Sequence, residues 1–327
     1  MNSTTQMIVA LRDRVLAGGS ITADEAYALA DISDSEGVAA LRDAAAEVTA
    51  RMVPRIFDSC SIVNARSGRC SENCKWCAQS AHWHTGCETY DLVDEEECMA
   101  AARHNAARGV RRFSLVASGH AVKGKALARI AAMLRRAKEE TGISTCASLG
   151  LIGPAELQEL WDAGVRRYHC NLEAAPSHFA TLCTTHTVAD KLATIAAARE
   201  IGFEVCSGGI IGMGETARQR AELAVTLREA CPVSIPINVL CPIPGTPLAD
   251  TPPISEDDII NTVAIFRMVH PTLQIRFAGG RQRLSRQAQM EAMRVGVNGG
   301  ITGDLLTTTG STIDSDKRLA GDAGYEF

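Results

Sequence analysis

The sequence contains no apolar stretch that approaches the roughly 20 residues needed by a membrane-spanning helix. It also has no run of Lys or Arg, and its net charge is −5, so the charge pattern does not favour a nucleic-acid partner. Residues 1–19 carry charges inside their apolar portion and lack the small-residue cleavage pattern of a signal peptide. We therefore expect a cytoplasmic protein that binds neither a membrane nor a nucleic acid.

Cysteine, by contrast, is abundant, with 12 among the 327 residues. A reducing compartment disfavours structural disulfides, so these thiols are expected to be metal ligands or small buried side chains. Because 46% of the residues are hydrophobic, the chain can bury a large core, in one large domain or in two ordinary ones.

The order of the expected elements predicts the fold class. Residues 1–50 carry apolar residues at helical spacing and are expected to form an N-terminal helical extension. Between residues 51 and 310, strand-like segments alternate with helical segments, most of which end at Gly. The expected strands are 59–65, 111–118, 143–150, 166–173, 203–212, 234–240, 273–280 and 299–306. Such alternation gives parallel βαβ units, and eight near-regular units favour an α/β fold of the TIM-type (β/α)8 barrel over a doubly wound open sheet. Residues 311–327 lack periodicity and are expected to form a flexible tail.

Three cysteines form a tight cluster directly after the first expected strand. Cys70, Cys74 and Cys77 have the spacing CxxxCxxC. Thiolates hold iron–sulfur clusters, and three of them leave one iron of a cubane without a protein ligand. An open position on a metal is where a cofactor or substrate can bind. Zinc is the alternative occupant, with His82 or His84 as a fourth ligand.

This loop resembles that of the radical S-adenosylmethionine superfamily. In that family the residue before the third cysteine is usually aromatic and packs on adenine, and Trp76 fits. Gly208, Ile210, Gly212 and Glu215 resemble the family's adenine-contacting segment. The resemblance implies that a 4Fe–4S cluster binds S-adenosylmethionine and that reduction releases a 5′-deoxyadenosyl radical. It places the cofactor-binding residues at Trp76, Ala117, Asn171, Glu173, His186, Ile210 and Ile211.

A narrower resemblance, to the biotin synthase family, runs from about Ile62 to Thr308. The matching motifs are Cys77-Ala-Gln79-Ser80, Thr145-Cys146-Ala-Ser-Leu-Gly150, Asn171-Leu-Glu173, Thr184-Thr185-His186-Thr187, Val205-Cys206-Ser-Gly-Gly209, Pro236-Ile-Asn238 and Ile275-Arg276. The resemblance implies that sulfur from a second iron–sulfur cluster is inserted into dethiobiotin. It also implies a flavodoxin- or ferredoxin-type electron donor and a homodimer.

The sequence departs from this family at one ligand of the second cluster. The family's pattern has three cysteines and an arginine, with one cysteine at the end of strand two, where this chain has Ser114. Either the serine replaces the thiolate, or the ligand set is different. Since each interior layer of a (β/α)8 barrel takes side chains from alternate strands, Cys60 on strand one would share a layer with Cys146, Cys206 and Arg276.

This layer favours a four-iron cluster with an extra sulfide, and a 2Fe–2S cluster is the alternative. Arg276, or a sulfide near its guanidinium, would complete the site, and we group Arg276 with the three loop cysteines as catalytic. Simple burial of Cys60 is the competing interpretation.

Polar residues on two further strands suggest where the ligands bind. Asn171 and Glu173 are two residues apart on a strand, and therefore on one face. By resemblance they bind the cofactor ribose and the ureido ring of the substrate. Asn238 can donate and accept hydrogen bonds at once, which suits a cyclic urea. His186 stands where the family places a basic residue near the cofactor.

The remaining cysteines fall into two groups. Cys98, Cys170 and Cys231 are expected to pack against the sheet or helices. The others lie in loops or at strand ends near the barrel mouth, where a role in the site stays open; they are Cys87, Cys183 and Cys241.

Two alternative functions stay open. One is a different radical enzyme of the same fold that acts on an amino acid or a metal-cofactor precursor, such as a hydrogenase maturase or methylornithine synthase. The other is a non-catalytic metal-binding protein.

Overall fold

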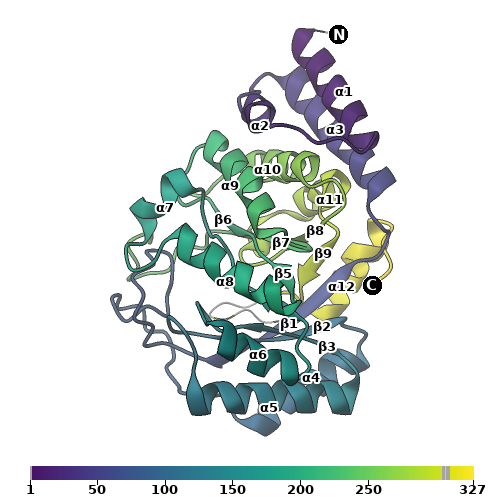
Figure 1. The fold of residues 1–327 in the computed structure, drawn as a ribbon. Coiled ribbons are helices and arrows are strands. Elements are labelled where there is room, and N and C mark those ends of the chain that lie inside the picture. Colours follow the sequence, from purple (N-terminus) through teal and green to yellow (C-terminus); the bar gives the residue numbers. More distant parts are fainter. Residues whose placement is uncertain (1, 304–305, 307–309) are drawn as a thin grey trace.

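A closed ring of parallel strands forms the centre of the molecule (Figure 1). The computed structural model describes residues 2–303, 306 and 310–327. The strands are β1 (Asp58–Arg66), β2 (Arg112–Ala117), β3 (Ser144–Ser148), β4 (Arg167–His169), β5 (Glu204–Cys206), β6 (Gly209–Ile211), β7 (Ser234–Val239), β8 (Gln274–Phe277) and β9 (Gly299–Ile301). Their order is β5-β4-β3-β2-β1-β9-β8-β7-β6, and a further pairing of β5 with β7 closes the ring.

The short strands β5 and β6 are two halves of the single strand expected at 203–212. Both pair with β7, so together they fill one of eight positions in the ring. The break falls at Gly208, where a Cβ atom would lie 2.0 Å from the carbonyl oxygen of Pro236, so only Gly fits there. The prediction of a (β/α)8 barrel is confirmed.

Helices cover the outside of the ring (Figure 1). They are α4 (Glu95–Ala107), α5 (Gly124–Thr141), α6 (Pro154–Asp162), α7 (Pro176–Leu182), α8 (Val188–Ile201), α9 (Ala217–Ala230), α10 (Glu256–Val269) and α11 (Arg286–Val295), with a 3₁₀ turn, η1 (Arg281–Arg283), before α11. Gly142 and Gly202 end α5 and α8 with φ values of 71° and 112°, a conformation that favours Gly. The residues of α5 that are buried are apolar, as its helical spacing predicts.

Three helices precede the barrel: α1 (Ser3–Leu16), α2 (Ala23–Ala30) and α3 (Ser35–Met52). They pack on one side of the barrel, against α9, α10 and α11 (Figure 1). A capping box starts α2, because Thr22 and Glu25 bond reciprocally to each other's backbone N–H groups.

The expectation of a flexible tail over residues 311–327 is wrong. A helix, α12 (Ile313–Asp322), occupies most of this segment, and Asp316 forms a buried ion pair with Arg281 at 2.5 Å. The final residue, Phe327, stacks on Phe57 with ring centroids 5.8 Å apart. Ile313, Leu319 and Ala320 of α12 are also buried, so a short apolar face helps to hold this segment in place.

No helix within the described residues is long and apolar enough to cross a membrane. The end of the expected strand 299–306 and Thr308 lie outside the described residues, apart from Leu306.

Candidate active site

The CxxxCxxC loop leaves β1 and folds back on itself. The backbone N–H of Cys70 donates to the carbonyl of Gln79 at 3.0 Å, and Ser80 Oγ donates to the carbonyl of Glu72 at 2.6 Å. The imidazole of His82 lies 3.0 Å from the carbonyl of Ser71 and therefore supports the loop backbone. These bonds fix the loop without help from a metal.

Burial raises the pKa of all three loop thiols, to about 11 for Cys77. The thiols are therefore protonated at neutral pH until a metal displaces their protons. Three thiolates on one tetrahedral zinc, at about 2.3 Å each, would lie about 3.8 Å apart. Among the described residues, the three loop sulfurs do not form a group with all donor atoms within 4.8 Å. This wider spacing fits a polynuclear cluster better than a single ion.

A cavity of about 370 Å³ runs from this loop into the barrel. At its mouth it is lined by Trp76, Cys77, Asn171, Glu173, Ile210 and Asn238, and deeper in the barrel by Cys60, Ser114, Cys146, His169, Cys206 and Arg276. Cys77 of the loop and the three deep cysteines therefore face one cavity.

The register of the strands places the deep residues in layers. Cys60 of β1 pairs with Arg112 of β2, which pairs with Ser144 of β3. Cys146 therefore lies two residues beyond the β3 residue that is in register with Cys60. The same advance of two residues per two strands leads from Cys146 to Cys206, then to Arg276, and back to Cys60. This closed path is the geometry of one four-residue layer in a (β/α)8 barrel. We call these four residues the cysteine layer.

By the same rule, Ser114 belongs to the next layer towards the mouth. It pairs with Cys146, and the advance of two residues leads to His169, Pro236 and Ile301. Ser114 thus faces the same cavity as Cys60 but from a different level.

A buried ionic network lies beneath the cysteine layer. Arg276 bonds through Nη2 to the carboxylate of Asp58 and through Nε to Ser234 Oγ at 2.8 Å. Arg167 lies 3.5 Å and Arg112 3.4 Å from the same carboxylate. Burial opposes ionisation of Asp58, but the three arginines hold its pKa below the usual value. Glu204 also pairs with Arg167, at 2.8 Å, so the three arginines exceed the two carboxylates by one charge, and the excess favours anionic ligands in the layer that holds Arg276.

Side-chain contacts favour ionisation of two of the three deep thiols, Cys60 and Cys206. The thiol of Cys146 hydrogen-bonds to Cys60, which lowers the pKa of Cys60 and raises that of Cys146. Burial opposes ionisation of Cys206, but His169 and Arg276 lower its pKa to about 6. His169 was not singled out in the sequence, although it stands two residues before Asn171 and alternation would have placed both on the same face.

The amides expected to bind substrate are already engaged with the backbone. Asn238 Oδ1 accepts from Gly279 N at 2.8 Å, and its Nδ2 donates to the carbonyl of Gly209 at 3.1 Å. Asn171 Oδ1 accepts from Gly208 N at 3.0 Å, and its Nδ2 donates to Glu173 at 3.2 Å. Each amide therefore keeps one N–H and one lone pair for a ligand.

Glu173 has a backbone φ of 72°. This left-handed region is uncommon for residues other than Gly, and such strained positions concentrate at ligand sites. Its side chain lines the cavity beside Asn171.

Three expected cofactor residues differ in their placement. Ile210 lines the cavity, whereas the next residue, Ile211, is buried on the opposite side because side chains alternate along β6. Ala117 ends β2, beside Arg66 of β1, and is not among the described residues that line the cavity.

The segment from Gly208 to Glu215 forms a turn held by its own carboxylate. Glu215 accepts from the backbone N–H of Gly212 at 2.8 Å and of Met213 at 2.7 Å. Gly212 has φ of 88°, which explains its presence in the motif.

His186 lies beside the cysteine loop, in the α7–α8 connection. Its ring bonds to Glu72 and packs edge-on against Phe179, with centroids 5.5 Å apart. Trp76 also packs edge-on against Phe179, with ring centroids 6.4 Å apart. The aromatic ring expected to contact adenine is therefore already positioned by packing.

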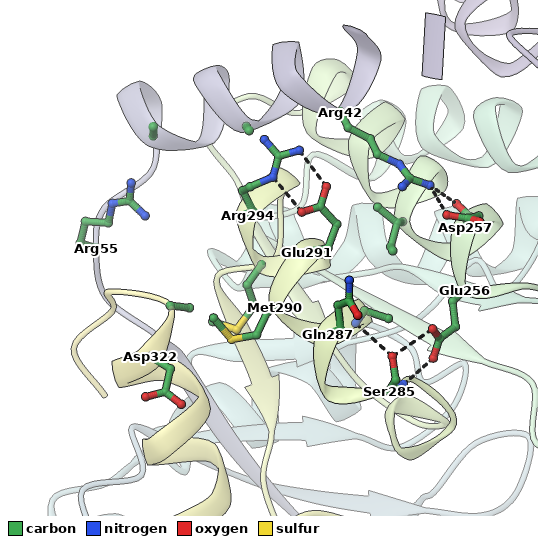
Figure 2. Close-up of a pocket in the computed structure, with 16 residues that line it drawn as sticks. Arg42, Arg55, Glu256, Asp257, Ser285, Gln287, Met290, Glu291, Arg294 and Asp322 are labelled. Carbon is green, nitrogen blue, oxygen red and sulfur yellow. Dashed lines mark hydrogen bonds and ion pairs between the residues drawn. The ribbon is translucent and has the colours of Figure 1, made fainter. Parts of the chain in front are cut away.

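A second hollow, of about 910 Å³, lies outside the barrel beside α3 and α11 (Figure 2). Four of its charged groups bind one another: Arg294 lies 2.7 Å from Glu291, and Arg42 lies 2.7 Å from Asp257. No cysteine or histidine occurs among the described residues that line it. We therefore place the active site inside the barrel.

Comparison with known proteins identifies the family. The radical SAM superfamily model matches residues 65–227, and the biotin and thiamin synthesis associated domain matches residues 236–326. The chain is 49% identical to biotin synthase of Porphyromonas gingivalis over 320 residues, which covers 98% of this chain and 96% of the relative. It is 48% identical to biotin synthase of Desulfotalea psychrophila, covering 98% and 95%. The chain belongs to the biotin synthase family. It is accordingly a radical S-adenosylmethionine enzyme, and that superfamily carries a 4Fe–4S cluster.

Solved structures agree on the fold of this biotin synthase family member. Methylornithine synthase has a TM-score of 0.82 at 17% identity, covering 97% of this chain and 96% of that one. The FeFe-hydrogenase maturase of Carboxydothermus hydrogenoformans has a TM-score of 0.81 at 15% identity, covering 98% and 79%. At these identities the likeness concerns the barrel alone. The far higher identity to biotin synthases decides against both alternative functions.

Proposed function

We propose that this chain converts dethiobiotin to biotin, with the inserted sulfur supplied by an auxiliary iron–sulfur cluster bound in the cysteine layer. The observation that carries the proposal is the single cavity that joins the CxxxCxxC loop to a separate layer of three thiols. A 4Fe–4S cluster on Cys70, Cys74 and Cys77 would supply the electron that cleaves S-adenosylmethionine into a hydrogen-abstracting radical.

Cys60, Cys146 and Cys206 are the proposed ligands of the auxiliary cluster. Thiolates are the preferred protein ligands of iron–sulfur clusters, and all three face the cavity from one layer. The lowered pKa of Cys60 and of Cys206 favours the thiolate that a metal requires.

Arg276 has a different role in this proposal. Although burial opposes its charge, Asp58 raises the pKa of Arg276 above its usual value, so the guanidinium stays protonated. A protonated guanidinium has no lone pair for a metal. Arg276 therefore acts as a hydrogen-bond donor and positive charge next to an additional sulfide, which supports a four-iron cluster over a 2Fe–2S cluster.

Asn171 and Asn238 bind the ureido ring, through the N–H and the lone pair that each amide keeps free. Glu173 and His186 are proposed to bind the cofactor at the mouth, with Trp76, Ala117, Ile210 and the backbone of Ile211 around the adenine. Positioned next to the radical, the substrate needs no general acid or base. The protein binds, orients and excludes competing reactions.

Three further properties are proposed from the family resemblance. The reducing electron comes from a flavodoxin- or ferredoxin-type donor, the chain forms a homodimer, and it works in the cytoplasm.

The test is to replace Cys70, Cys74 and Cys77 together with Ala and to reconstitute both proteins anaerobically. The variant should lose all cleavage of S-adenosylmethionine but keep the iron and sulfide of one cluster, measured by Mössbauer spectroscopy. Biotin should form only in the unaltered protein. Persistent cleavage in the variant would contradict the assignment of the loop.

A further inference from the structure

Three metal-binding side chains converge between the cysteine loop and the α7–α8 connection. Cys74 Sγ lies 3.7 Å from Cys183 Sγ, and Cys183 Sγ lies 3.9 Å from His186 Nε2. Within residues 2–303, 306 and 310–327, no other three His, Cys, Asp or Glu side chains bring all their donor atoms within 4.8 Å. Cys183 has no role in the proposed reaction, so this group requires its own explanation.

Two of the three donor separations can be compared with those around one tetrahedral ion, and the third, between Cys74 Sγ and the imidazole of His186, is at most 4.8 Å. With Zn–S bonds of about 2.3 Å and Zn–N bonds of about 2.0–2.1 Å, two sulfurs lie about 3.8 Å apart, and a sulfur and a nitrogen about 3.6 Å apart. The observed separations are 3.7 Å and 3.9 Å. The distances therefore need only a small adjustment to accept an ion.

A buried carboxylate orients the imidazole for this task. His186 Nδ1 bonds to Glu72 Oε2, which leaves Nε2 as the ring nitrogen with the free lone pair. Glu72 is itself fixed by Thr185 Oγ1 at 2.6 Å and by His120 Nδ1 at 2.9 Å. A histidine held by a carboxylate in this way is the usual arrangement behind a zinc ligand.

The two segments are held together without iron. The N–H of Lys75 donates to the carbonyl of Leu182 at 3.0 Å. Asn73 Oδ1 accepts from the N–H of Thr184 at 2.9 Å, and the N–H of Asn73 donates to Thr185 Oγ1 at 3.2 Å. The three donors are thus brought together by protein contacts alone.

We propose that the cluster-free chain binds one zinc-type divalent ion through Cys74, Cys183 and His186, with water in the fourth position. Binding releases the two thiol protons and involves no change of oxidation state. Cys74 is shared with the proposed loop cluster, so the ion and that cluster exclude each other. Ion binding itself does not depend on the proposed function; the exclusion does.

Cobalt(II) is the probe of choice, because its visible spectrum reports tetrahedral thiolate ligation. The full chain, freed of iron by a chelator under anaerobic conditions, should bind one Co²⁺ that the Cys183→Ser variant lacks, apart from Co²⁺ held by the cysteine layer in both, and Zn²⁺ should displace it. Cys183→Ser should weaken binding by roughly a hundredfold or more, since it removes a direct ligand, whereas Glu72→Gln should weaken it by about 10–100-fold. Cys77→Ser is the matched control, since it alters a loop cysteine outside the group and should leave binding unchanged.

The proposal is overturned if Cys77→Ser abolishes the cobalt bands while Cys183→Ser keeps them, or if the unaltered chain binds no ion. Circular dichroism melting of each variant separates lost ligation from lost folding. Zinc loaded beforehand should slow assembly of the loop cluster in the unaltered chain, but not in Cys183→Ser. If the unaltered chain never assembles a loop cluster, the proposed function fails, yet the cobalt titration still decides the ion site.

Discussion

Replacing Cys60 with Ala separates two ligand sets for the auxiliary cluster. The register places Cys60 in one layer with Cys146, Cys206 and Arg276, whereas Ser114 lies in the next layer with His169. A serine hydroxyl must also lose a proton of high pKa before it can bind iron, which a thiol does far more readily. Ser114→Ala is therefore the matched control, because it removes a cavity-facing heteroatom from the neighbouring level.

The size of the effect follows from the number of iron atoms. With four irons on the loop, loss of a four-iron auxiliary cluster removes about half of the total, and loss of a 2Fe–2S cluster about one third. The cost to folding is small, since Cys60→Ala deletes one buried heavy atom, worth about 1 kcal/mol. The variant should therefore remain folded while it loses the cluster.

Anaerobic iron and sulfide analysis with Mössbauer spectroscopy measures the outcome. Cys60→Ala should form no biotin but still cleave S-adenosylmethionine, and Ser114→Ala should keep its iron. The reasoning is refuted if Ser114→Ala loses the auxiliary cluster while Cys60→Ala retains it.

Two further predictions concern the amide and the ionic network. Asn238→Ala removes a partner of the ureido ring, and an unsatisfied buried polar group costs about 1–3 kcal/mol, so calorimetric titration should show dethiobiotin binding about tenfold weaker or more. Unchanged affinity would exclude Asn238 as a substrate ligand, and S-adenosylmethionine binding is the control. Asp58→Asn leaves buried arginines without their counter-charge and should lower the free energy of unfolding by about 3–5 kcal/mol at neutral pH. The pKa of Asp58 is lowered in the folded protein, so its contribution is present above the unfolded pKa and disappears as pH falls through the folded one. Urea unfolding should show that the free energies of unfolding of the unaltered chain and of Asp58→Asn become more similar as the pH falls. A difference between them that grows in acid would contradict the reasoning.

Local sequence patterns were sufficient to predict the barrel and the strand on which each cysteine proposed to bind the auxiliary cluster lies. Alternating strands and helices predict the ring, and strand parity alone predicts that Cys60 faces the same layer as Cys146. Successive side chains on a strand point to opposite faces, and each interior layer of the barrel takes its residues from alternate strands. Once the fold is known, both rules can be applied to the sequence alone.

The features that the sequence did not show depend on contacts between distant segments. The ion pair between Asp316 of α12 and Arg281 joins two separate segments, which no local pattern reveals. The approach of Cys183 to Cys74 depends on how the α7–α8 connection crosses the loop. The break between β5 and β6 follows from the close approach of Gly208 to Pro236, which belongs to another strand.

The ionic network beneath the cysteine layer also determines how the chamber is loaded. Asp58 and Arg167 are 3% exposed and Ser234 is fully buried, so these side chains fill the amino-terminal side of the cysteine layer. Among the described residues, Trp76 and Asn171 line the mouth of the cavity that holds the cysteine layer. A ligand that binds at the deep end of such a cavity must enter before the mouth is occupied. It can leave only after the ligand at the mouth has dissociated. Any sulfur delivered to restore the deep site has to use the same entrance, after the mouth has been vacated.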